Sequence, residues 1–356
     1  MNYIGSKLSL LEFIENSIFQ VVDGNCSVFC DLFAGTGAVG SHFKKKGFKI
    51  IANDLQYYSY VLNRHYIGNH NELDFQNLSE IIPELQYKAL SLRRIAVCEY
   101  LNSIEGTEGF IYNNYCSGGS VSCGEERQYF SDENGMRCDA IRQEIEMWMN
   151  KEYITDDEYF FLVTSLLESV DKYANTASVY GAFLKKLKRT AQNRLIIKPA
   201  ELIINDRNHE VYCGDINSRV EKISGDIVYL DPPYNHRQYA ANYHILETIA
   251  KYDNPIIYGK TGLRGYKDQK SLYCSKTEVK KTFVDLISKL KAKYIFLSYN
   301  NEGLLLFDDI REILSKCGEY GCFYREYNRF KADRPENRYF KYAKTVEYLH
   351  YVIVNT

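Results

Sequence analysis

The feature that most constrains this chain is the segment Asp226-Ile-Val-Tyr-Leu-Asp-Pro-Pro-Tyr234 near its middle. The apolar residues 227–230 predict a buried strand, and two prolines end it because proline neither donates to a strand ladder nor continues a helix. Such a strand presents Asp231, Pro232 and Tyr234 to a cleft. Their carboxylate, backbone carbonyl and aromatic face suit a planar ring with an exocyclic amino group. An ordinary turn is the alternative, and other segments must decide.

Composition excludes several classes of protein. No apolar run approaches the roughly 20 residues that cross a bilayer, so no membrane segment is expected. Glu12 and Glu15 lie where a signal peptide needs an apolar core, and the ten cysteines form no CxxC pair, so we expect a cytoplasmic location. Cys116, Cys123 and Cys138 fit no common zinc spacing, so no metal is expected.

The net charge is only −2, so a nucleic-acid partner would have to contact local basic patches. One such patch lies within residues 181–209 and includes Lys185 and Lys188. A second runs from Arg325 to Lys344 and is interleaved with aromatic residues. For either patch, a solvated helix face or loop is the alternative reading.

A second constraint comes from residues 27–40, which predict a buried strand, a glycine-rich turn and a helix. Gly35, Gly37 and Gly40 fit the G-x-G-x-x-G pattern of dinucleotide-binding turns, which raises an oxidoreductase as an alternative. Asp31 argues against it, because a carboxylate just before the glycines would repel a pyrophosphate. The same carboxylate suits a cofactor with a cationic ammonium end. S-adenosyl-L-methionine has that end and no phosphate.

Acidic residues also end other predicted strands. Asp54 follows the strand 48–53 and can take the ribose hydroxyls of either cofactor class. Asp215 ends a short strand and could accept a hydrogen bond from an adenine amino group, with Ile216 covering the ring. Ligands of doubly wound sheets bind at the carboxyl ends of the strands, so this pattern predicts an α/β fold with a mostly parallel sheet. Residues 345–354 are expected to form its closing edge strand.

The alternation of strand and helix is lost between about residues 69 and 204. This insert is polar and mainly helical, and insertions of this size on a regular sheet commonly carry substrate recognition. We therefore expect a catalytic and cofactor-binding domain of residues 1–68 and 205–356. Residues 69–204 are expected to form an inserted helical domain that recognises the target.

Together these segments resemble the adenine-N6 DNA methyltransferases of the Dam-type group, and most of all the methyltransferase halves of the FokI restriction-modification system. The resemblance covers nearly the whole chain and rests on these segments in this order: NYIGSK, DLFAGTGAVG, ND, CGDI, DPPYNHRQYAANYHILET, LSYNNEG and EYLHYVIVN. It implies a Rossmann-like fold that uses S-adenosyl-L-methionine. It also implies methyl transfer to the N6 amino group of a flipped adenine in double-stranded DNA, with a cognate restriction endonuclease as a separate partner.

The resemblance assigns roles to individual residues. Lys7, at the entrance of a predicted helix, and Tyr3 would hold the methionine end of the cofactor. Further cofactor contacts would come from Asp31, Phe33, Gly35, Gly37, Asp54, Leu55, Asp215 and Ile216. The target base would be held by Asp231, Pro232, Pro233 and Tyr234. DNA contacts are expected from Arg127, Tyr129, Asn134, Arg137, Lys185, Lys188, Arg237 and Arg264.

Three other functions share part of this pattern. Cytosine-N4 methylation uses the same geometry, and Asp rather than Ser at position 231 disfavours it. Methylation of RNA or of a protein amide would more usually place Asn there. A DNA-binding module without activity is disfavoured because the glycine-rich cofactor segment (residues 31–37) and the catalytic segment (residues 231–234) are both intact.

Overall fold

The structure is a computed structural model that describes residues 3–327 and 345–355. Its contacts divide the chain into two compact units. The first, which we call the sheet unit, contains Gly5–Asn63, Arg207–Gln238 and Asp268–Thr356. The second, which we call the helical unit, contains Met1–Ile4, Arg64–Asp206 and Tyr239–Lys267.

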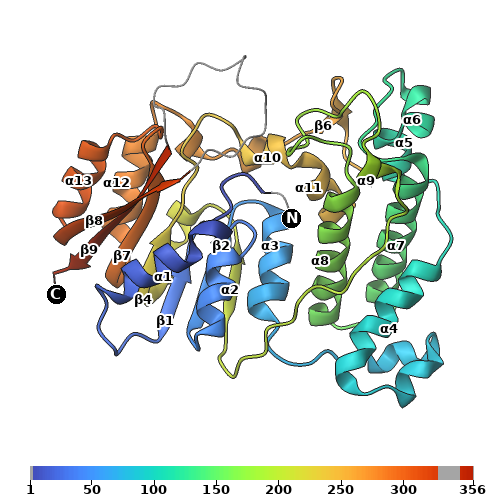
Figure 1. Cartoon of the computed structure of the whole chain (residues 1–356), viewed down its shortest axis with the longest axis horizontal. Helices are drawn as coiled ribbons and strands as arrows, with labels where there is room; N and C mark the ends of the chain where they lie inside the picture. Colours follow the sequence, from blue (N-terminus) through green and yellow to red (C-terminus); the bar gives the residue numbers. More distant parts are fainter. Residues whose placement is uncertain (1–2, 328–344, 356) are drawn as a thin grey trace. The chain divides into compact units, whose positions relative to one another are not determined.

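The sheet unit is built on a sheet whose described strands follow the order β3-β2-β1-β4-β7-β9-β8 (Figure 1). These strands are β1 (Val28–Asp31), β2 (Lys49–Asp54), β3 (Glu210–Cys213), β4 (Ser224–Leu230), β7 (Lys291–Asn300), β8 (Gly318–Tyr327) and β9 (Thr345–Val354). Strands β1 to β4 and β7 pair in parallel, and β9 is antiparallel to β7 and β8. The predicted doubly wound, mostly parallel α/β sheet is confirmed.

One strand position differs from the prediction. Residues 345–354 were expected at the edge, but β9 lies between β7 and β8, and β8 forms the described edge. The sequence of β8, GEYGCFYREY, mixes glycine and charged residues with aromatic ones. Such a mixed sequence predicts a strand only weakly, and it becomes a strand here because it pairs with β9 along one edge.

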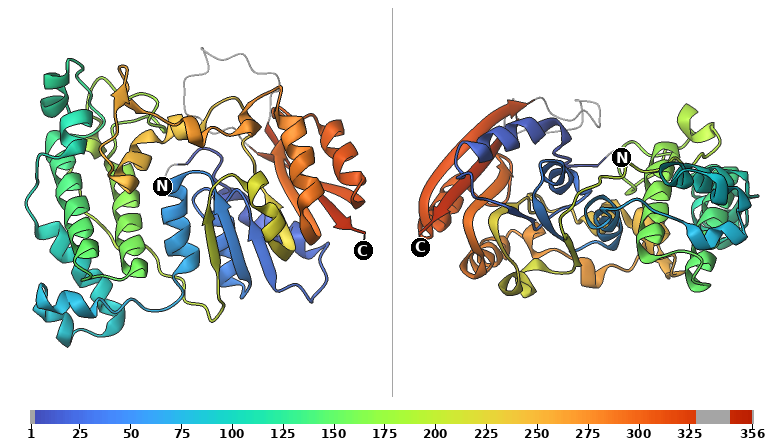
Figure 2. Two further views of the ribbon diagram at one scale, coloured as in Figure 1. Left: turned by 180° about the vertical axis from the view of Figure 1, so that it is seen from behind. Right: turned by 90° about the horizontal axis from the view of Figure 1, so that it is seen from below.

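Helices cover both faces of this sheet (Figure 2). They are α1 (Leu11–Phe19), α2 (Ala38–Lys45), α3 (Tyr57–Asn63), α12 (Val279–Lys289) and α13 (Phe307–Ser315). Side chains alternate along a strand, so Cys30 of β1 and Leu32, which directly follows β1, join the core formed with α12 and α13. Phe29 points to the other face and stacks on Phe43 of α2, with 4.0 Å between ring centroids. Asp31 therefore lies on the α2 face.

The helical unit contains two long helices, α7 and α8, that pack side by side (Figure 1). Its elements are α4 (Leu90–Ser103), α5 (Phe110–Tyr115), α6 (Ser117–Ser120), α7 (Asp132–Asn150), α8 (Asp156–Tyr173), α9 (Arg189–Gln192), α10 (Tyr239–Asn242), α11 (His244–Lys251), β5 (Ile257–Tyr258) and β6 (Leu263–Arg264). A capping box of Thr155 and Glu158 begins α8. In the described residues, we find no helix with both the length and the apolar character needed to cross a membrane.

The helical unit is larger than the predicted insert, because residues 239–267 belong to it. Two buried arginines explain this grouping. Arg127 donates to the backbone carbonyls of Gly259 and Lys260 at 3.0 and 3.2 Å. Arg142 donates to the carbonyls of Ile249 and Ala250 at 3.0 and 3.2 Å. These long-range bonds leave no local sequence signal.

Arg127 and Arg137 were predicted to contact DNA, and the structure corrects this. Both are buried, with 5% and 3% of their surface exposed. Arg137 donates to the backbone carbonyls of Leu195, Ile104 and Asn102 at 3.0, 3.3 and 3.1 Å. Both guanidinium groups are buried and donate to backbone carbonyls of the helical unit, so neither lies at a surface where it could reach a base.

Tyr129, Asn134 and Arg264 are corrected for the same reason, since all three are buried. The Tyr129 hydroxyl donates to the Tyr180 carbonyl at 2.8 Å, and the Asn134 amide binds backbone groups near α9. Arg264 makes a two-bond pair with Asp253 at 3.0 and 2.6 Å. Each side chain stabilises the helical unit rather than facing a ligand.

We expect Arg137→Ala to lower the free energy of unfolding by about 2–4 kcal/mol, because the buried Leu195 carbonyl and two half-buried carbonyls lose their donor. Arg194→Ala is the matched control, since Arg194 is exposed and its pairing with Glu133 is also exposed. Urea unfolding followed by circular dichroism measures both variants. Equal stability of Arg137→Ala and wild type would contradict the structural role.

Candidate active site

Four acidic residues meet at one end of the sheet, because β3, β2, β1 and β4 are parallel neighbours. Asp31 and Asp54 are the last residues of β1 and β2. Asp231 directly follows β4, and Asp215 follows β3 after a short turn. Parallel strands place their carboxyl ends on the same side, so the segments predicted to form the site are brought together by the fold.

The glycine-rich turn after β1 has the backbone conformation that requires glycine. Gly35 and Gly37 have φ angles of +52° and +78°. A Cβ atom at Gly37 would lie 2.9 Å from the Asn63 side-chain oxygen, so a larger residue does not fit. The Gly35 N–H donates to Asp54 Oδ2 at 2.8 Å, and Asn63 donates to the Gly35 carbonyl at 3.0 Å. Asp54 and Asn63 therefore fix this turn against β2 and α3.

Asp31 is buried, and only one of its two carboxyl oxygens has a hydrogen-bond partner in the described part of the chain. Its Oδ2 atom accepts a hydrogen bond from the Gly40 N–H in α2 at 3.0 Å, whereas the buried Oδ1 has no hydrogen-bond partner among the described residues. Burial, and next the charge of Asp231, raise the pKa of Asp31 to about 8. A buried carboxyl oxygen without a donor is costly unless a ligand supplies one. This atom fits the cationic ammonium end of an amino-acid cofactor.

A buried cluster of charge surrounds Asp231. Lys7 Nζ lies 2.9 Å from Asp231 Oδ1 and 3.2 Å from Glu347 Oε1. The Ser298 hydroxyl donates to the same Glu347 oxygen at 2.5 Å. Burial alone lowers the pKa of Lys7, but the two carboxylates outweigh burial and raise this pKa well above its usual value. Lys7 is therefore held as a cation.

Asp231 is the most accessible member of this cluster, with 17% of its side chain exposed. Burial and the charge of Glu347 raise the pKa of Asp231 to about 6, against the opposing charge of Lys7. Lys7 binds Oδ1 only, and no donor from the described residues reaches Oδ2. In the same described part of the chain, no backbone N–H donates to the Pro232 carbonyl. Two adjacent acceptors are thus available to a ligand.

Tyr234 completes the arrangement. The residue is half-buried, and its ring meets Tyr299 edge to face with 6.5 Å between centroids. Its carbonyl accepts from the Leu304 N–H at 3.0 Å, which fixes the backbone after the two prolines. Pro232 is buried and Pro233 half-buried. A carboxylate, a carbonyl and an aromatic ring therefore come from one short, rigid segment.

The remaining predicted cofactor residues have varied surroundings. Phe33 packs edge to face on Tyr273 at 5.1 Å, and Ile216 is buried in the sheet core. Leu55 is half-buried, and Asp215 is exposed, with a side chain that accepts from the Asn217 N–H at 3.3 Å. These four residues remain predicted cofactor contacts.

Lys7 and Tyr3 stay predicted contacts of the methionine end of the cofactor, and the structure shows their protein neighbours. The Lys7 ammonium has two protein carboxylates as partners. Tyr3 belongs to the helical unit, where it stacks on Tyr243 at 4.7 Å and lies 5.6 Å from Tyr239. The sequence placed Lys7 at a helix entrance, and this gave no information about its partners.

Sequence analysis missed Glu347 and Ser298 in this cluster. Both lie in apolar strand sequences, at EYLHY in β9 and FLSYN in β7. An acid inside an apolar strand indicates a buried partner, because an acidic side chain is rarely fully buried without one. The partner, Lys7, is 340 residues away in sequence and could not be inferred locally.

Three predicted DNA contacts remain available. In the helical unit, Lys185 is exposed and Lys188 is half-buried, with Nζ donating to the Thr176 carbonyl at 3.2 Å. In the sheet unit, Arg237 is exposed just after the catalytic segment. Its backbone N–H donates to the Asn235 side chain at 2.9 Å, which orders the turn. The basic patch 325–344 lies largely outside the described residues.

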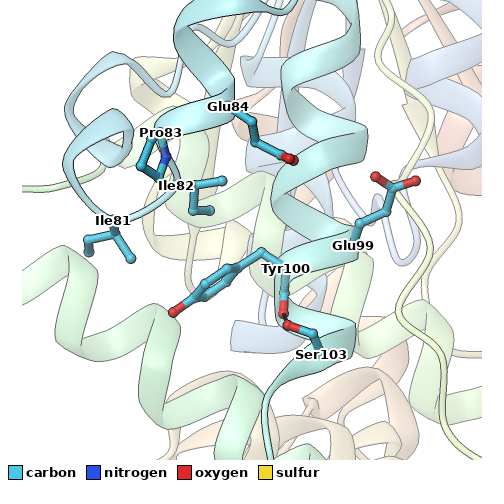
Figure 3. A pocket seen from close by; sticks show the side chains of 7 residues that line it. All are labelled: Ile81, Ile82, Pro83, Glu84, Glu99, Tyr100 and Ser103. Atoms are coloured by element: carbon cyan, nitrogen blue, oxygen red, sulfur yellow. Dashed lines mark hydrogen bonds between the residues drawn. The ribbon is translucent and has the colours of Figure 1, made fainter.

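A pocket in the helical unit has different chemistry (Figure 3). It is lined by Ile81, Ile82, Pro83, Glu84, Glu99, Tyr100 and Ser103. Two carboxylates and no basic side chain line it, so it does not suit a phosphate backbone. Among the described residues, no group of three or more His, Cys, Asp or Glu side chains is arranged to hold a metal ion.

Comparison with known proteins identifies the family. Residues 3–313 match the family model of the D12 class N6 adenine-specific DNA methyltransferases. The Type II methyltransferase M.NlaIII of Neisseria lactamica is 50% identical over 352 residues, covering 98% of each chain. M.FokI of Planomicrobium okeanokoites is 39% identical over 99% of this chain and 52% of that longer protein. This chain belongs to the D12 class of N6 adenine-specific DNA methyltransferases.

Proposed function

We propose that the protein methylates the N6 amino group of an adenine flipped out of a specific double-stranded DNA sequence, with S-adenosyl-L-methionine as methyl donor. The observation that carries this proposal is the pair of open acceptors, Asp231 Oδ2 and the Pro232 carbonyl, beside the half-buried Tyr234 ring. As in the Type II relatives, the activity would protect DNA within a restriction-modification system. A cognate endonuclease is the partner we propose.

The chemistry follows from the two acceptors. The amino nitrogen of adenine is a poor nucleophile because its lone pair is delocalised into the ring. Hydrogen bonds from its two N–H groups to Asp231 and Pro232 localise that pair and direct it toward the methyl group, so catalysis depends on position and electrostatics. Because the amino group is base-paired in duplex DNA, the base must leave the stack, and Tyr234 offers it a new stacking surface.

Residues at the strand ends would hold the cofactor, which supplies an electrophilic methyl group on a sulfonium. The unpartnered Asp31 Oδ1 atom fits its ammonium group. The turn at Gly35 and Gly37 would let the backbone approach the cofactor closely. Asp54 would accept hydrogen bonds from the ribose hydroxyls. Asp215 and Ile216 would bind the adenine, with Phe33 and Leu55 nearby in the same segments.

DNA binding would draw on exposed basic residues of each unit. In the helical unit, the segment after α8 exposes these basic side chains: Lys185, Lys186, Arg189, Arg194 and Lys198. Asn175 orders this segment, because its amide donates to the Leu184 carbonyl and its oxygen accepts from the Lys188 N–H, both at 2.9 Å. In the sheet unit, Arg237 would contact a phosphate near the flipped base. Binding through such residues weakens steeply with salt.

We expect Asp231→Ala to lower the single-turnover methylation rate by about 10²–10³, because an aligning acceptor is lost. DNA binding should persist, since an anion is removed near phosphate. Asp308→Ala, which changes an exposed aspartate of the same unit, is the control. A rate within a few-fold of wild type for Asp231→Ala would remove the carboxylate from the mechanism.

We expect cofactor binding to release a proton below about pH 8. Asp31 has a pKa of about 8 in the free protein, so it is mostly neutral at pH 7 and must ionise to pair with an ammonium group. Affinity for S-adenosyl-L-methionine should therefore rise with pH between about 6 and 7.5, by up to about tenfold per unit. Calorimetry in two buffers of different ionisation enthalpy measures how many protons are released when the cofactor binds.

Asp31→Asn provides the comparison for this experiment. The variant should bind more weakly and lose the proton release, because its side chain cannot ionise. Identical heats for the wild type in both buffers would show that Asp31 is already ionised before the cofactor binds, and would contradict the expectation.

A further inference from the structure

Glu347 is a buried acid that lies opposite Arg325 of β8 and pairs with Lys7. It lies in β9 opposite Asn300 of β7, with 2% of its surface exposed. It lies outside residues 3–313, the part of the chain that matches the family model. Its contacts are Lys7 Nζ at 3.2 Å and the Ser298 hydroxyl at 2.5 Å. Nothing on its own strand explains why a carboxylate is placed here.

The balance of charge makes this placement informative. Lys7 and Asp231 already form a neutral pair at 2.9 Å. Glu347 adds a second buried carboxylate to one ammonium, and burying an extra charge is costly. A neutral glutamine would fill the same space and still bond Ser298. An acid at this position therefore points to a role for its negative charge in the behaviour of Lys7 and Asp231.

We propose that Glu347 is a positioning residue for methyl transfer: it holds the Lys7 ammonium against Asp231 Oδ1 and offsets its charge, leaving Asp231 Oδ2 oriented and basic toward the target amino group. The inference rests on the proposed function. Lysine has a long, flexible side chain, so a single carboxylate contact fixes it poorly. A second carboxylate, itself anchored by Ser298, restrains the ammonium from the opposite side.

The charge of Glu347 matters because Lys7 alone would make Asp231 a weaker acceptor. During transfer, the N6 lone pair forms the new N–C bond while the C–S bond breaks and its electron pair stays on sulfur. The nitrogen then loses one proton, which Asp231 Oδ2 accepts and later releases to solvent. An ammonium at Oδ1 opposes this uptake, and a nearby carboxylate favours it.

Other charged or titratable groups also face Asp231, but each has a different task. They are Lys7 at the N-terminal segment, Asp31 at the end of β1, Tyr229 in β4 and Tyr234 after the prolines. Asp31 and Tyr234 belong to the proposed cofactor and base sites. Glu347 is the charged neighbour of Asp231 that can be changed without altering a group proposed to touch substrate or cofactor.

The test is Glu347→Gln, which removes the charge and keeps the shape. Single-turnover methylation is measured against pH between about 5 and 8, with calorimetry of cofactor binding on the same sample. We expect the plateau rate to fall roughly tenfold and the midpoint of the acid limb to move down by roughly one unit, because the charge that raises the Asp231 pKa is gone. Cofactor affinity should not change.

Glu210→Gln is the matched control. Glu210 lies in β3 of the same sheet and pairs with Lys49 at 2.6 Å, so the same substitution removes the charge from a more exposed ion pair away from Asp231. Its rate and acid limb should match wild type. Ser298→Ala is a second test if Glu347→Gln does not fold, since it removes the hydroxyl that anchors Glu347. It should lower the rate a few-fold and shift the limb in the same direction.

The outcomes separate the two claims. A wild-type enzyme that does not methylate DNA would end the proposed function and this inference with it. If the wild type is active and Glu347→Gln keeps its rate and acid limb, only the inference is overturned. A lower rate with an unmoved acid limb also overturns it, because a purely structural role predicts that result. If Glu347→Gln does not fold, an unchanged Ser298→Ala variant overturns it in the same way.

Discussion

The buried contact between Lys7 and Asp231 is the interaction on which the active site depends. Burial at the end of β4 raises the pKa of the Asp231 carboxyl group and so favours its neutral form. The ammonium at 2.9 Å opposes that tendency, and Glu347 and Ser298 in turn hold the ammonium. This cluster joins a residue near the start of the chain, one near the middle and one near the end. The sheet must therefore be fully formed before Asp231 has its working environment.

The parallel sheet supplies the rest of the site. Neighbouring parallel strands end on the same side, so Asp31, Asp54 and Asp231 are brought together although they are far apart in sequence. The glycine turn at 35–37 is fixed by Asp54 and Asn63. The two prolines after Asp231 stop the strand, and no backbone N–H in the described part of the chain donates to the Pro232 carbonyl. Backbone geometry thus forms the site that we propose for one amino group and one cationic cofactor.

Sequence patterns predicted the strands and turns whose conformation depends on residues that are neighbours in the chain. Strands β1 and β2 end at the predicted acids Asp31 and Asp54, and Asp231 directly follows β4. The catalytic segment was identified because Asp-Pro-Pro-Tyr has few structural explanations. Strand β8 was missed because its mixed sequence makes sense only beside β9. Patterns of this kind depend on neighbours that are distant in the chain.

Arginine residues show most clearly what the sequence could not reveal. Arg137 and Lys185 both looked like DNA contacts, yet Arg137 is buried against three carbonyls and Lys185 is exposed. Nothing in their neighbouring residues distinguishes them, because long-range packing decides which cation is covered. Lys7 is similar: its position at a helix entrance was predicted, but its partners, Asp231 and Glu347, are set by the sheet.

The most direct test of the account is the identity of the methylated nucleoside. The protein is incubated with duplex DNA and S-adenosyl-L-methionine labelled in its methyl group, and the DNA is then digested to nucleosides and separated. The account predicts that the label appears in N6-methyladenine, at a defined sequence. Label in N4-methylcytosine, or no transfer of label to DNA, would contradict it.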